Sequence, residues 1–295
     1  MTVSADFAIT PPFEVDVPEN GASPCVFNSP HSGRYYPSRF LSMSRLDQRA
    51  IRRSEDFFVD ELFASAPQFG AAFMRANFPR SYVDVNREPY ELDPRMFSGS
   101  LPPFANRNSI RVAGGLGTIP RVVAEGQNIY PRRLPYEEAQ DRIRHIYKPY
   151  HDVLRGLLSR VHARFGCALL VDCHSMPASV KTSEASNADF IIGDRFGTSA
   201  SRDVTALISE TLSGLGYKVV ANKPYAGGFI TEHYGRPAKH LHAVQIEINR
   251  GLYFDERKMV KLPGFSALKE DMFAFSNVIS KLPIEMLSEF SLAAE

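Results

Sequence analysis

Residues 168–175 have the sequence Ala-Leu-Leu-Val-Asp-Cys-His-Ser, and this stretch decides the predicted fold. Its first six residues are typical of a short buried strand, which runs directly into His174. An earlier stretch, Pro24–Asn28, has the same form and runs into Ser-Pro-His-Ser-Gly, which contains His31. Open α/β sheets bind ligands at the carboxyl ends of their strands, so both histidines are expected at such a position.

Strands and helices alternate along the rest of the chain. Further strands are expected over 73–85, 189–193, 217–221 and 243–249. Helices are expected over 44–66, 134–165, 199–215 and 264–281, the first capped by Ser44 and the second broken near Pro149, with a short final helix after Pro283. The pattern predicts an α/β fold, in which helices flank a central mixed, mostly parallel sheet.

The chain shows no internal repeat, low-complexity run or clear linker, so one domain over residues 1–295 is expected. Residues 1–23 are expected to form a polar N-terminal lead-in with a short edge strand. Residues 88–134 are rich in Pro, Gly and Arg and predict a long loop region near the site, because loops of this length are uncommon unless they are functional.

Composition excludes several classes of function. The formal net charge of +1 provides no field that would attract nucleic acid or a membrane surface. No apolar run reaches the roughly 18 residues of a membrane-spanning helix, and the N-terminus lacks the pattern of a signal peptide. The three cysteines Cys25, Cys167 and Cys173 are expected to be reduced core residues, which indicates a cytoplasmic protein.

His31 and His174 could bind a metal ion together with one carboxylate. Two histidines and a carboxylate are the protein ligands of many catalytic zinc sites, which keep a fourth position for water. Glu55 and Asp56 are candidates, since one of them must lie near the apolar side of the adjacent Phe57-Phe58 pair. An unpaired buried charge costs several kcal/mol, and either a metal ion or a salt bridge to a nearby arginine would prevent this cost.

The segment Asp84-Val85-Asn86-Arg87 is suited to binding a carboxylate. On a strand, Asp84 and Asn86 would share one side, and Asn86 with Arg87 would offer a fork of donors. Arg80 is a further candidate donor. The alternative is a surface Arg87 that pairs with Glu88.

The segment Val244–Arg250 carries an acidic residue within an apolar strand. Alternation places Glu247 on the face opposite Ile246 and Ile248, and glutamate is unusual in such surroundings. Metal-assisted hydrolysis needs a carboxylate that takes a proton from water and returns it to the leaving amine. Glu247 is suited to this role; the alternatives are a salt bridge to Arg250 and an exposed position on an edge strand.

Other motifs are less specific. The Gly-rich stretch 111–118 is neither a P-loop nor a dinucleotide fingerprint, and it predicts either a flexible cover over the site or a plain surface loop. His240 and His242 could share one strand face, although a structural or peripheral role is favoured. His233 could approach a substrate. No nucleophile elbow and no His-Glu-x-x-His helix is present.

Taken in order, these segments resemble the N-formylglutamate amidohydrolase family. The matching stretches are 28–33, 56–62, 80–87, 171–175, 189–193, 222–228 and 245–253. The family is similar to the zinc carboxypeptidases and aspartoacylases, which implies a phosphorylase/hydrolase-like fold. Arg34 occupies the place where those relatives carry a glutamate ligand. The resemblance therefore implies Asp56 as the carboxylate ligand, with Glu55 and Asp60 as alternatives.

The resemblance implies zinc-dependent hydrolysis of N-formyl-L-glutamate, or a close N-acyl amino acid, to formate and L-glutamate, as in one route of histidine degradation. The implied zinc ligands are His31, Asp56 and His174. Glu247 is the implied general base, and Arg80 the implied stabiliser of the oxyanion. The implied substrate-binding residues are Asn86, Arg87, Arg250 and Gly228. The alternatives are a deacylase for another N-acyl amino acid or small amide, and a non-catalytic domain that binds an amino acid or peptide. No nucleic-acid or membrane partner is expected.

Overall fold

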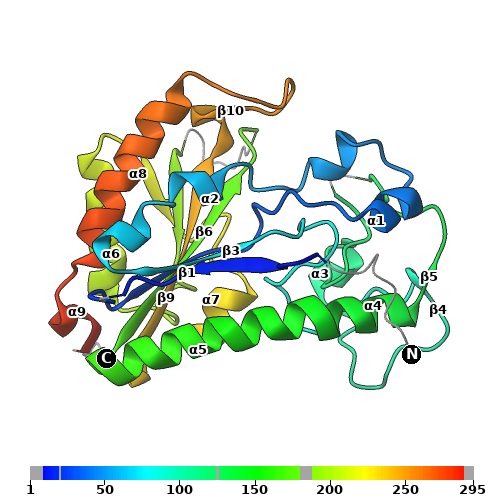
Figure 1. Cartoon of the computed structure of the whole chain (residues 1–295), viewed down its shortest axis with the longest axis horizontal. Coiled ribbons are helices and arrows are strands. Elements are labelled where there is room, and N and C mark those ends of the chain that lie inside the picture. The colour runs from blue at the N-terminus through cyan, green and yellow to red at the C-terminus, as the bar shows by residue number, and fades with distance from the viewer. Residues whose placement is uncertain (1–8, 20, 124–125, 180–187, 289–295) are drawn as a thin grey trace. The chain divides into compact units, whose positions relative to one another are not determined.

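The computed structural model of the chain describes residues 9–19, 21–123, 126–179 and 188–288 (Figure 1). Parts of the expected lead-in (1–8 and 20) and of the expected loop region (124–125) lie outside the described residues. The chain divides into two compact units. Unit 1 comprises residues up to Glu14, Pro30–Glu55 and Arg75–Val153, and unit 2 comprises Val15–Ser29, Asp56–Met74 and the chain from Leu154. The single domain expected from the sequence stays a prediction.

A seven-stranded mixed sheet forms the centre of the fold. Its strands lie in the order β1 (Phe13–Asp16), β3 (Ala72–Ala76), β2 (Cys25–Ser29), β6 (Ala168–Met176), β9 (Leu241–Asn249), β7 (Phe190–Gly193) and β8 (Val219–Ala221). The pairs β2–β6, β6–β9 and β7–β8 are parallel, and β7 runs antiparallel to β9. The predicted α/β fold with a mixed, mostly parallel sheet is confirmed, and β1 is an edge strand as expected.

The two faces of the central strands differ in polarity because alternate side chains point to opposite sides of a sheet. On one face, Phe27, Val171 and Ile246 lie in the main apolar core of unit 2. The longer helices α6 (Arg202–Gly214) and α8 (Gly264–Ser280) cover this face and contribute Ile208 and Phe275 to the core (Figure 1). The other face carries the polar residues described below.

The remaining elements are short apart from one long helix. The helices are α1 (Ser38–Met43), α2 (Val59–Leu62), α3 (Ile110–Ala113), α4 (Tyr136–Arg142), α5 (Lys148–Phe165), α7 (Phe229–Tyr234) and α9 (Ile284–Ser288). Two small ladders join β4 (Phe97–Ser98) with β5 (Leu134–Pro135) and β10 (Phe254–Asp255) with β11 (Val260–Lys261). The expected loop region 88–134 therefore contains little regular structure.

The helix expected over 44–66 is wrong. The structure has a 3-10 helix at Ala50–Arg52 and then the single turn of α2. Phe58 has a left-handed backbone with φ of 58°, which a right-handed helix cannot include. Ser44 ends α1 instead of starting a helix, and the Asp47 side chain accepts the N–H groups of Arg49 and Ala50 at 2.9 and 2.6 Å.

Two strand boundaries also differ from the expectation. Strand β3 ends at Ala76, and the chain then turns, with the N–H of Tyr82 donating to Pro79 O at 2.9 Å. Asp84 lies in the irregular segment that follows, outside any strand, and its N–H donates to Thr118 O. In contrast, β6 continues through His174 to Met176, because β9 pairs with it up to Asn249.

The expected helix break at Pro149 is also wrong. The chain stays helical from α4 to α5 through one π-helical turn, Ile143–Tyr147. Proline lacks an N–H group, and its ring crowds the carbonyl four residues earlier. That carbonyl belongs to His145, within the wider π turn, so the local change of helix type replaces a break.

Unit 1 has its own core around a buried arginine. The Arg142 guanidinium lies 4.1 Å from the centre of the Tyr82 ring and donates to the Tyr130 hydroxyl at 2.7 Å. It also forms an ion pair with Glu138 at 3.1 Å. This pairing satisfies a charge that would otherwise be costly to bury.

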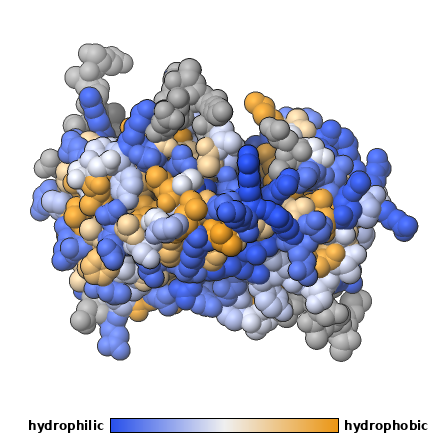
Figure 2. All heavy atoms as spheres, turned by 90° about the horizontal axis from the view of Figure 1, so that it is seen from above, coloured by the Kyte–Doolittle hydropathy of each residue, from blue (hydrophilic) through white to orange (hydrophobic). Residues whose placement is uncertain are grey.

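In the part of the chain that the structure describes, no helix is both long and apolar enough to cross a membrane. Figure 2 shows hydrophobic residues lying among hydrophilic ones on one face of the molecule. Exposed apolar groups such as Ile110 and Phe273 are normal on a water-facing surface. The three cysteines are buried free thiols, as expected.

Candidate metal centre

The polar face of the sheet in unit 2 carries a row of side chains that the register brings together. Asn28 pairs with Asp172, and Asp172 with Gln245, across three parallel strands. Two residues further along, His174 pairs with Glu247. Register partners in a parallel ladder emerge on the same face, and neighbouring strands lie about 4.8 Å apart. Glu247 therefore shares the face of His174 and lies opposite the apolar core, as alternation predicted.

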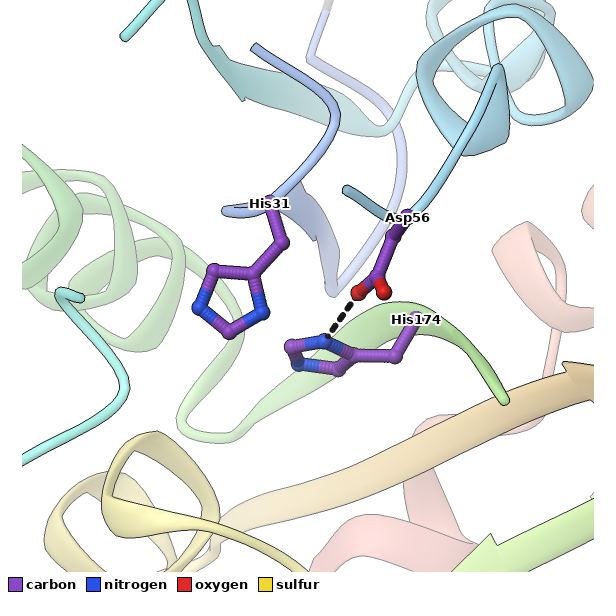
Figure 3. Close-up of side chains that lie close together, drawn as sticks. All are labelled: His31, Asp56 and His174. Atoms are coloured by element: carbon purple, nitrogen blue, oxygen red, sulfur yellow. Dashed lines mark hydrogen bonds and ion pairs between the residues drawn. The ribbon is translucent and has the colours of Figure 1, made fainter. Parts of the chain in front are cut away.

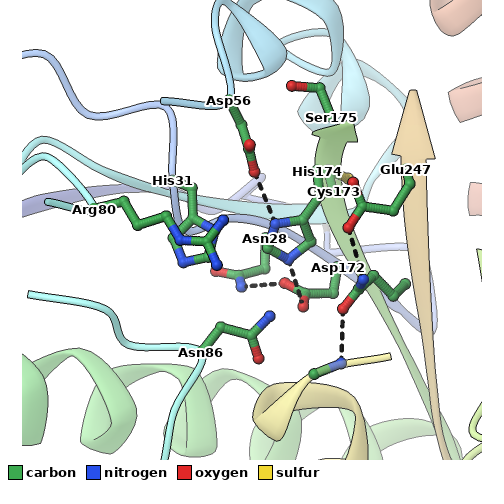
Figure 4. A network of polar contacts seen from close by, with 12 residues as sticks. Asn28, His31, Asp56, Arg80, Asn86, Asp172, Cys173, His174, Ser175 and Glu247 are labelled. Carbon is green, nitrogen blue, oxygen red and sulfur yellow. Dashed lines mark hydrogen bonds and ion pairs between the residues drawn. The ribbon is translucent and has the colours of Figure 1, made fainter. Parts of the chain in front are cut away.

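His174 is buried between two carboxylates. Its Nδ1 lies 2.9 Å from Asp56 Oδ2, and its Nε2 lies 2.9 Å from Asp172 Oδ2 (Figure 4). Burial lowers the pKa of this histidine, but Asp172 and Asp56 together raise it well above its ordinary value. Loss of the Nδ1 proton would free this nitrogen for a metal ion, with Nε2–H still donating to Asp172.

Asp56 is held by an arginine from the far end of the chain. Arg250 Nη2 donates to Asp56 Oδ1 at 3.0 Å, and its Nε donates to the Ser175 hydroxyl at 2.9 Å. Arg250 also pairs with Glu256 at 3.1 Å. Binding of a substrate carboxylate by Arg250 stays a prediction. In the structure Arg250 contacts Asp56.

In unit 1, His31 follows β2 and is buried with its own carboxylate partner. Its Nε2 lies 2.9 Å from Asp84 Oδ1. Gly33, two residues after His31, passes so close to the backbone of Phe78 that a side chain could not fit there, which constrains the turn after the histidine. The arrangement leaves Nδ1 as the nitrogen that could bind a metal ion.

Asp84 gathers three cationic or ionisable groups in unit 1. Arg80 Nε donates to Asp84 Oδ2 at 2.9 Å, and Arg87 Nη2 lies 3.6 Å from the same oxygen. Burial alone would raise the pKa of Asp84, but Arg80, Arg87 and His31 hold it well below its usual range. Burial lowers the pKa of Arg87 to about 10, so this guanidinium remains charged at neutral pH.

Asn86 and Arg87, the predicted donors to a substrate carboxylate, make hydrogen bonds within unit 1, and their contact with a substrate stays a prediction. Asp84 Oδ1 accepts the N–H of Asn86 at 2.8 Å, and Arg87 donates to the backbone carbonyls of Leu116 and Asn86 at 2.8 and 2.7 Å. The stretch 111–118 therefore contacts this segment of unit 1 through Leu116 and Thr118. A flexible cover formed by that stretch stays a prediction.

His31, Asp56 and His174 form a buried group that could bind a metal ion. Each offers one ligand atom, and these atoms lie within 4.8 Å of one another (Figure 3). Of the three carboxylates considered from the sequence, Asp56 belongs to this group. Glu55 instead accepts two hydrogen bonds from Arg52, at 2.8 and 2.9 Å, which is the salt-bridge alternative.

The other three histidines considered from the sequence are placed as follows. His242 Nδ1 accepts the N–H of Ser201 at 3.0 Å, and its Nε2 donates to Leu287 O at 2.9 Å, so its role is structural as favoured. His240 has a left-handed backbone in the turn before β9. His233 lies in α7, and its contact with a substrate stays a prediction.

Sequence reasoning missed three side chains that position this site. Asp172 lies two residues before His174 on the same strand face, and Gln245 has the same relation to Glu247. The period of two in a strand was the available signal for both. Asp84 was recognised only as part of a possible donor segment, because its contact with His31 spans 53 residues.

The fold and the site define an α/β protein with a buried candidate metal centre, a class that includes metal-dependent hydrolases. Comparison with known proteins is more specific. The family model of N-formylglutamate amidohydrolase matches residues 23–254. The chain therefore belongs to the N-formylglutamate amidohydrolase family.

Individual relatives agree with this assignment. The N-formylglutamate deformylase of Pseudomonas putida is 29% identical over 244 residues, which cover 80% of this chain and 84% of the relative. The structure of N-formylglutamate amidohydrolase from Ralstonia eutropha JMP134 has 34% identity and a TM-score of 0.86, and the match covers 92% of this chain and 97% of the other. The gene product Atu2144 of Agrobacterium tumefaciens, at 18% identity and a TM-score of 0.56 over 89% of this chain and 94% of the other, shares the fold.

Proposed function

We propose that the chain hydrolyses N-formyl-L-glutamate to formate and L-glutamate, with one zinc ion held by His31, Asp56 and His174. The observation that carries the proposal is the buried group of two histidines and one carboxylate, with Glu247 on the sheet face of His174. The names of the relatives from Pseudomonas putida and Ralstonia eutropha support the choice of substrate.

The donor set is suited to zinc. Two imidazole nitrogens and one carboxylate oxygen are common zinc ligands at catalytic sites. Each histidine has a carboxylate from outside the proposed ligand set on one ring nitrogen, Asp84 for His31 and Asp172 for His174. This arrangement fixes the ring and increases its basicity. A zinc ion held there would lower the pKa of a water molecule toward about 7 and polarise the formyl carbonyl.

The chain's own residues then perform the proton transfers and hold the substrate. Glu247 takes a proton from the attacking water and afterwards donates it to the leaving nitrogen, so that formate and a free amino group result. Arg80 stabilises the negative charge on the formyl oxygen; loss of one such donor costs roughly 10²–10³-fold in rate. Asn86 and Arg87 bind a substrate carboxylate, and Gly228 lines the substrate site.

Formate release and metal content test the proposal together. The purified protein is expected to contain about one zinc ion per chain, measured by elemental analysis, and to release formate from N-formyl-L-glutamate. N-acetyl-L-glutamate is the matched alternative substrate. Preference for the acetyl compound would favour a deacylase of another N-acyl amino acid, and absence of both metal and amine release would favour the non-catalytic binding domain.

Replacement of the proposed base is the sharpest single variant. Glu247→Gln keeps the size of the side chain but cannot accept the proton, so kcat is expected to fall by roughly 10²–10⁴-fold. Zinc content should be unchanged, because Glu247 is not a proposed ligand. Glu210 lies on the exposed side of α6, so Glu210→Gln is the matched control, and its kcat and zinc content should equal those of the wild type. Near-normal turnover of Glu247→Gln would exclude Glu247 as the base.

A further inference from the structure

A buried amide links the proposed base to a backbone loop. Gln245 lies two residues before Glu247 in β9, is 5% exposed, and donates from Nε2 to Glu247 Oε1 at 2.8 Å. Its Oε1 accepts the N–H of Gly228 at 2.8 Å. A dashed line at the Glu247 carboxylate in Figure 4 marks the first of these hydrogen bonds.

The direction of the two hydrogen bonds is fixed by chemistry. The backbone N–H of Gly228 can only donate, so the oxygen of the Gln245 amide must face it. The amide NH₂ group then faces Glu247, whose Oε1 must act as the acceptor. A side-chain amide accepts from Gly228 and donates to a carboxylate without adding charge.

The loop that provides this N–H is itself tied to β7, the strand next to β9. A Cβ atom on Gly193 would lie 2.6 Å from the carbonyl carbon of Ala226, so the absence of a side chain permits this close approach. The N–H of Arg195 donates to Ala226 O at 2.7 Å, and the N–H of Asn222 donates to Ile192 O at 2.8 Å. The loop 222–228 is thus anchored at both ends.

We infer that Gln245 is a positioning residue for this reaction, which holds the Glu247 carboxylate in its reactive place by linking it to the Gly228 N–H. The inference rests on the proposed role of Glu247 as the base. It also gives Gly228 a second role, as the fixed end of this link. A carboxylate on a flexible stem has several rotamers, and a displacement of about 1 Å can cost roughly 10²-fold in rate.

A double-mutant cycle separates positioning from a merely structural role. Gln245→Met keeps similar length but makes neither hydrogen bond, and we expect kcat to fall by about 10²-fold with KM changed by less than about threefold. In the Glu247→Gln background the same change should have no further effect, because there is no longer a base to position. Losses that multiply in the double variant, or a Gln245→Met enzyme with wild-type kcat, would overturn the inference.

Two further variants distinguish a loss of positioning from a loss of folding. Gln245→Glu keeps the acceptor for Gly228 but presents an oxygen to Glu247, so it should lose kcat as Gln245→Met does. The control Gln68→Met changes an exposed glutamine of unit 2 and should leave kcat and thermal unfolding unchanged. Unfolding curves of the two Gln245 variants identify any loss that is due to stability alone.

Crystal structures provide a readout that does not need turnover. In Gln245→Met, the Glu247 carboxylate is expected to leave its wild-type position, and an unmoved carboxylate would contradict the inference. A wild-type protein that releases no formate would instead contradict the proposed function. The two failures are therefore distinguishable.

Discussion

Each candidate metal histidine binds a carboxylate through the nitrogen that points away from the proposed ion. For His174 this partner is Asp172, which also accepts the Asn28 amide at 2.8 Å through its other oxygen. For His31 the partner is Asp84. Such outer carboxylates set the tautomer and orientation of the ring, so they influence metal affinity without touching the ion.

Among single residues, the outer carboxylate Asp172 provides a test: Asp172→Asn is expected to weaken zinc binding by roughly 10–100-fold. The wild-type carboxylate accepts from both His174 and Asn28. The side-chain amide of the variant has only one oxygen, so if this oxygen faces His174, its NH₂ group faces the NH₂ group of Asn28. One of the two hydrogen bonds is therefore lost. Zinc affinity is measured by titration against a competing chelator. The control Asp203→Asn, exposed in the first turn of α6, should bind zinc as wild type, and an unchanged affinity of Asp172→Asn would contradict the prediction.

At the scale of elements, the site depends on irregular segments that lie beside regular strands. The turn at Phe58 interrupts what the sequence suggested as a helix, and Asp56 lies just before it. Phe57 stacks on Phe254 with ring centres 4.2 Å apart, and this packing fixes the adjacent Asp56 backbone. The loop 222–228 packs closely against Gly193 at the end of β7, and its Gly228 N–H donates to the Gln245 side chain.

Gly193→Ala tests the second of these segments. The added Cβ would approach the Ala226 backbone at 2.6 Å, so the loop must move. We expect a loss of about 1–3 kcal/mol in the free energy of unfolding, as for other overpacked sites. We also expect a lower kcat, because the Gly228 N–H moves with the loop. Urea unfolding and formate release measure the two effects. Gly214→Ala is the control, since a Cβ atom there meets open space.

At the scale of the whole molecule, buried carboxylates make stability depend on pH. Arginines hold the pKa of Asp84 well below its usual range despite its burial, and Arg95 and Arg121 likewise lower the pKa of the buried Asp93. The pKa of an aspartate in the unfolded chain is about 3.9. The stabilising contribution of both groups is therefore present above about pH 3.9 and is lost as the pH falls toward their folded pKa values.

We therefore expect the free energy of unfolding of the metal-free protein to fall steeply below about pH 4. Asp84→Asn removes one of the two contributions, so this variant should be less stable at neutral pH and show a shallower fall in acid. Urea unfolding between about pH 6 and 2 measures both slopes. Parallel curves for the two proteins would contradict the assignment to Asp84.

The sequence by itself determined the sheet and the faces of its strands. Apolar runs and the period of two were sufficient to predict β2, β6 and β9 and to place Glu247 opposite Ile246, because these features depend only on neighbouring residues. The two histidines at or beyond the strands' carboxyl ends were recognised for the same reason. Family membership then followed from the ordered set of motifs and was confirmed by the match over residues 23–254.

Only the tertiary structure decided which partners these residues have. Asp56, rather than Glu55, belongs to the candidate metal group: Glu55 pairs with Arg52, whereas Asp56 contacts His174. Arg250 supports Asp56 from 194 residues away, and Asp172 binds Asn28 across 144 residues. Local patterns specify the face of a strand, whereas contacts between distant residues depend on how the whole chain packs.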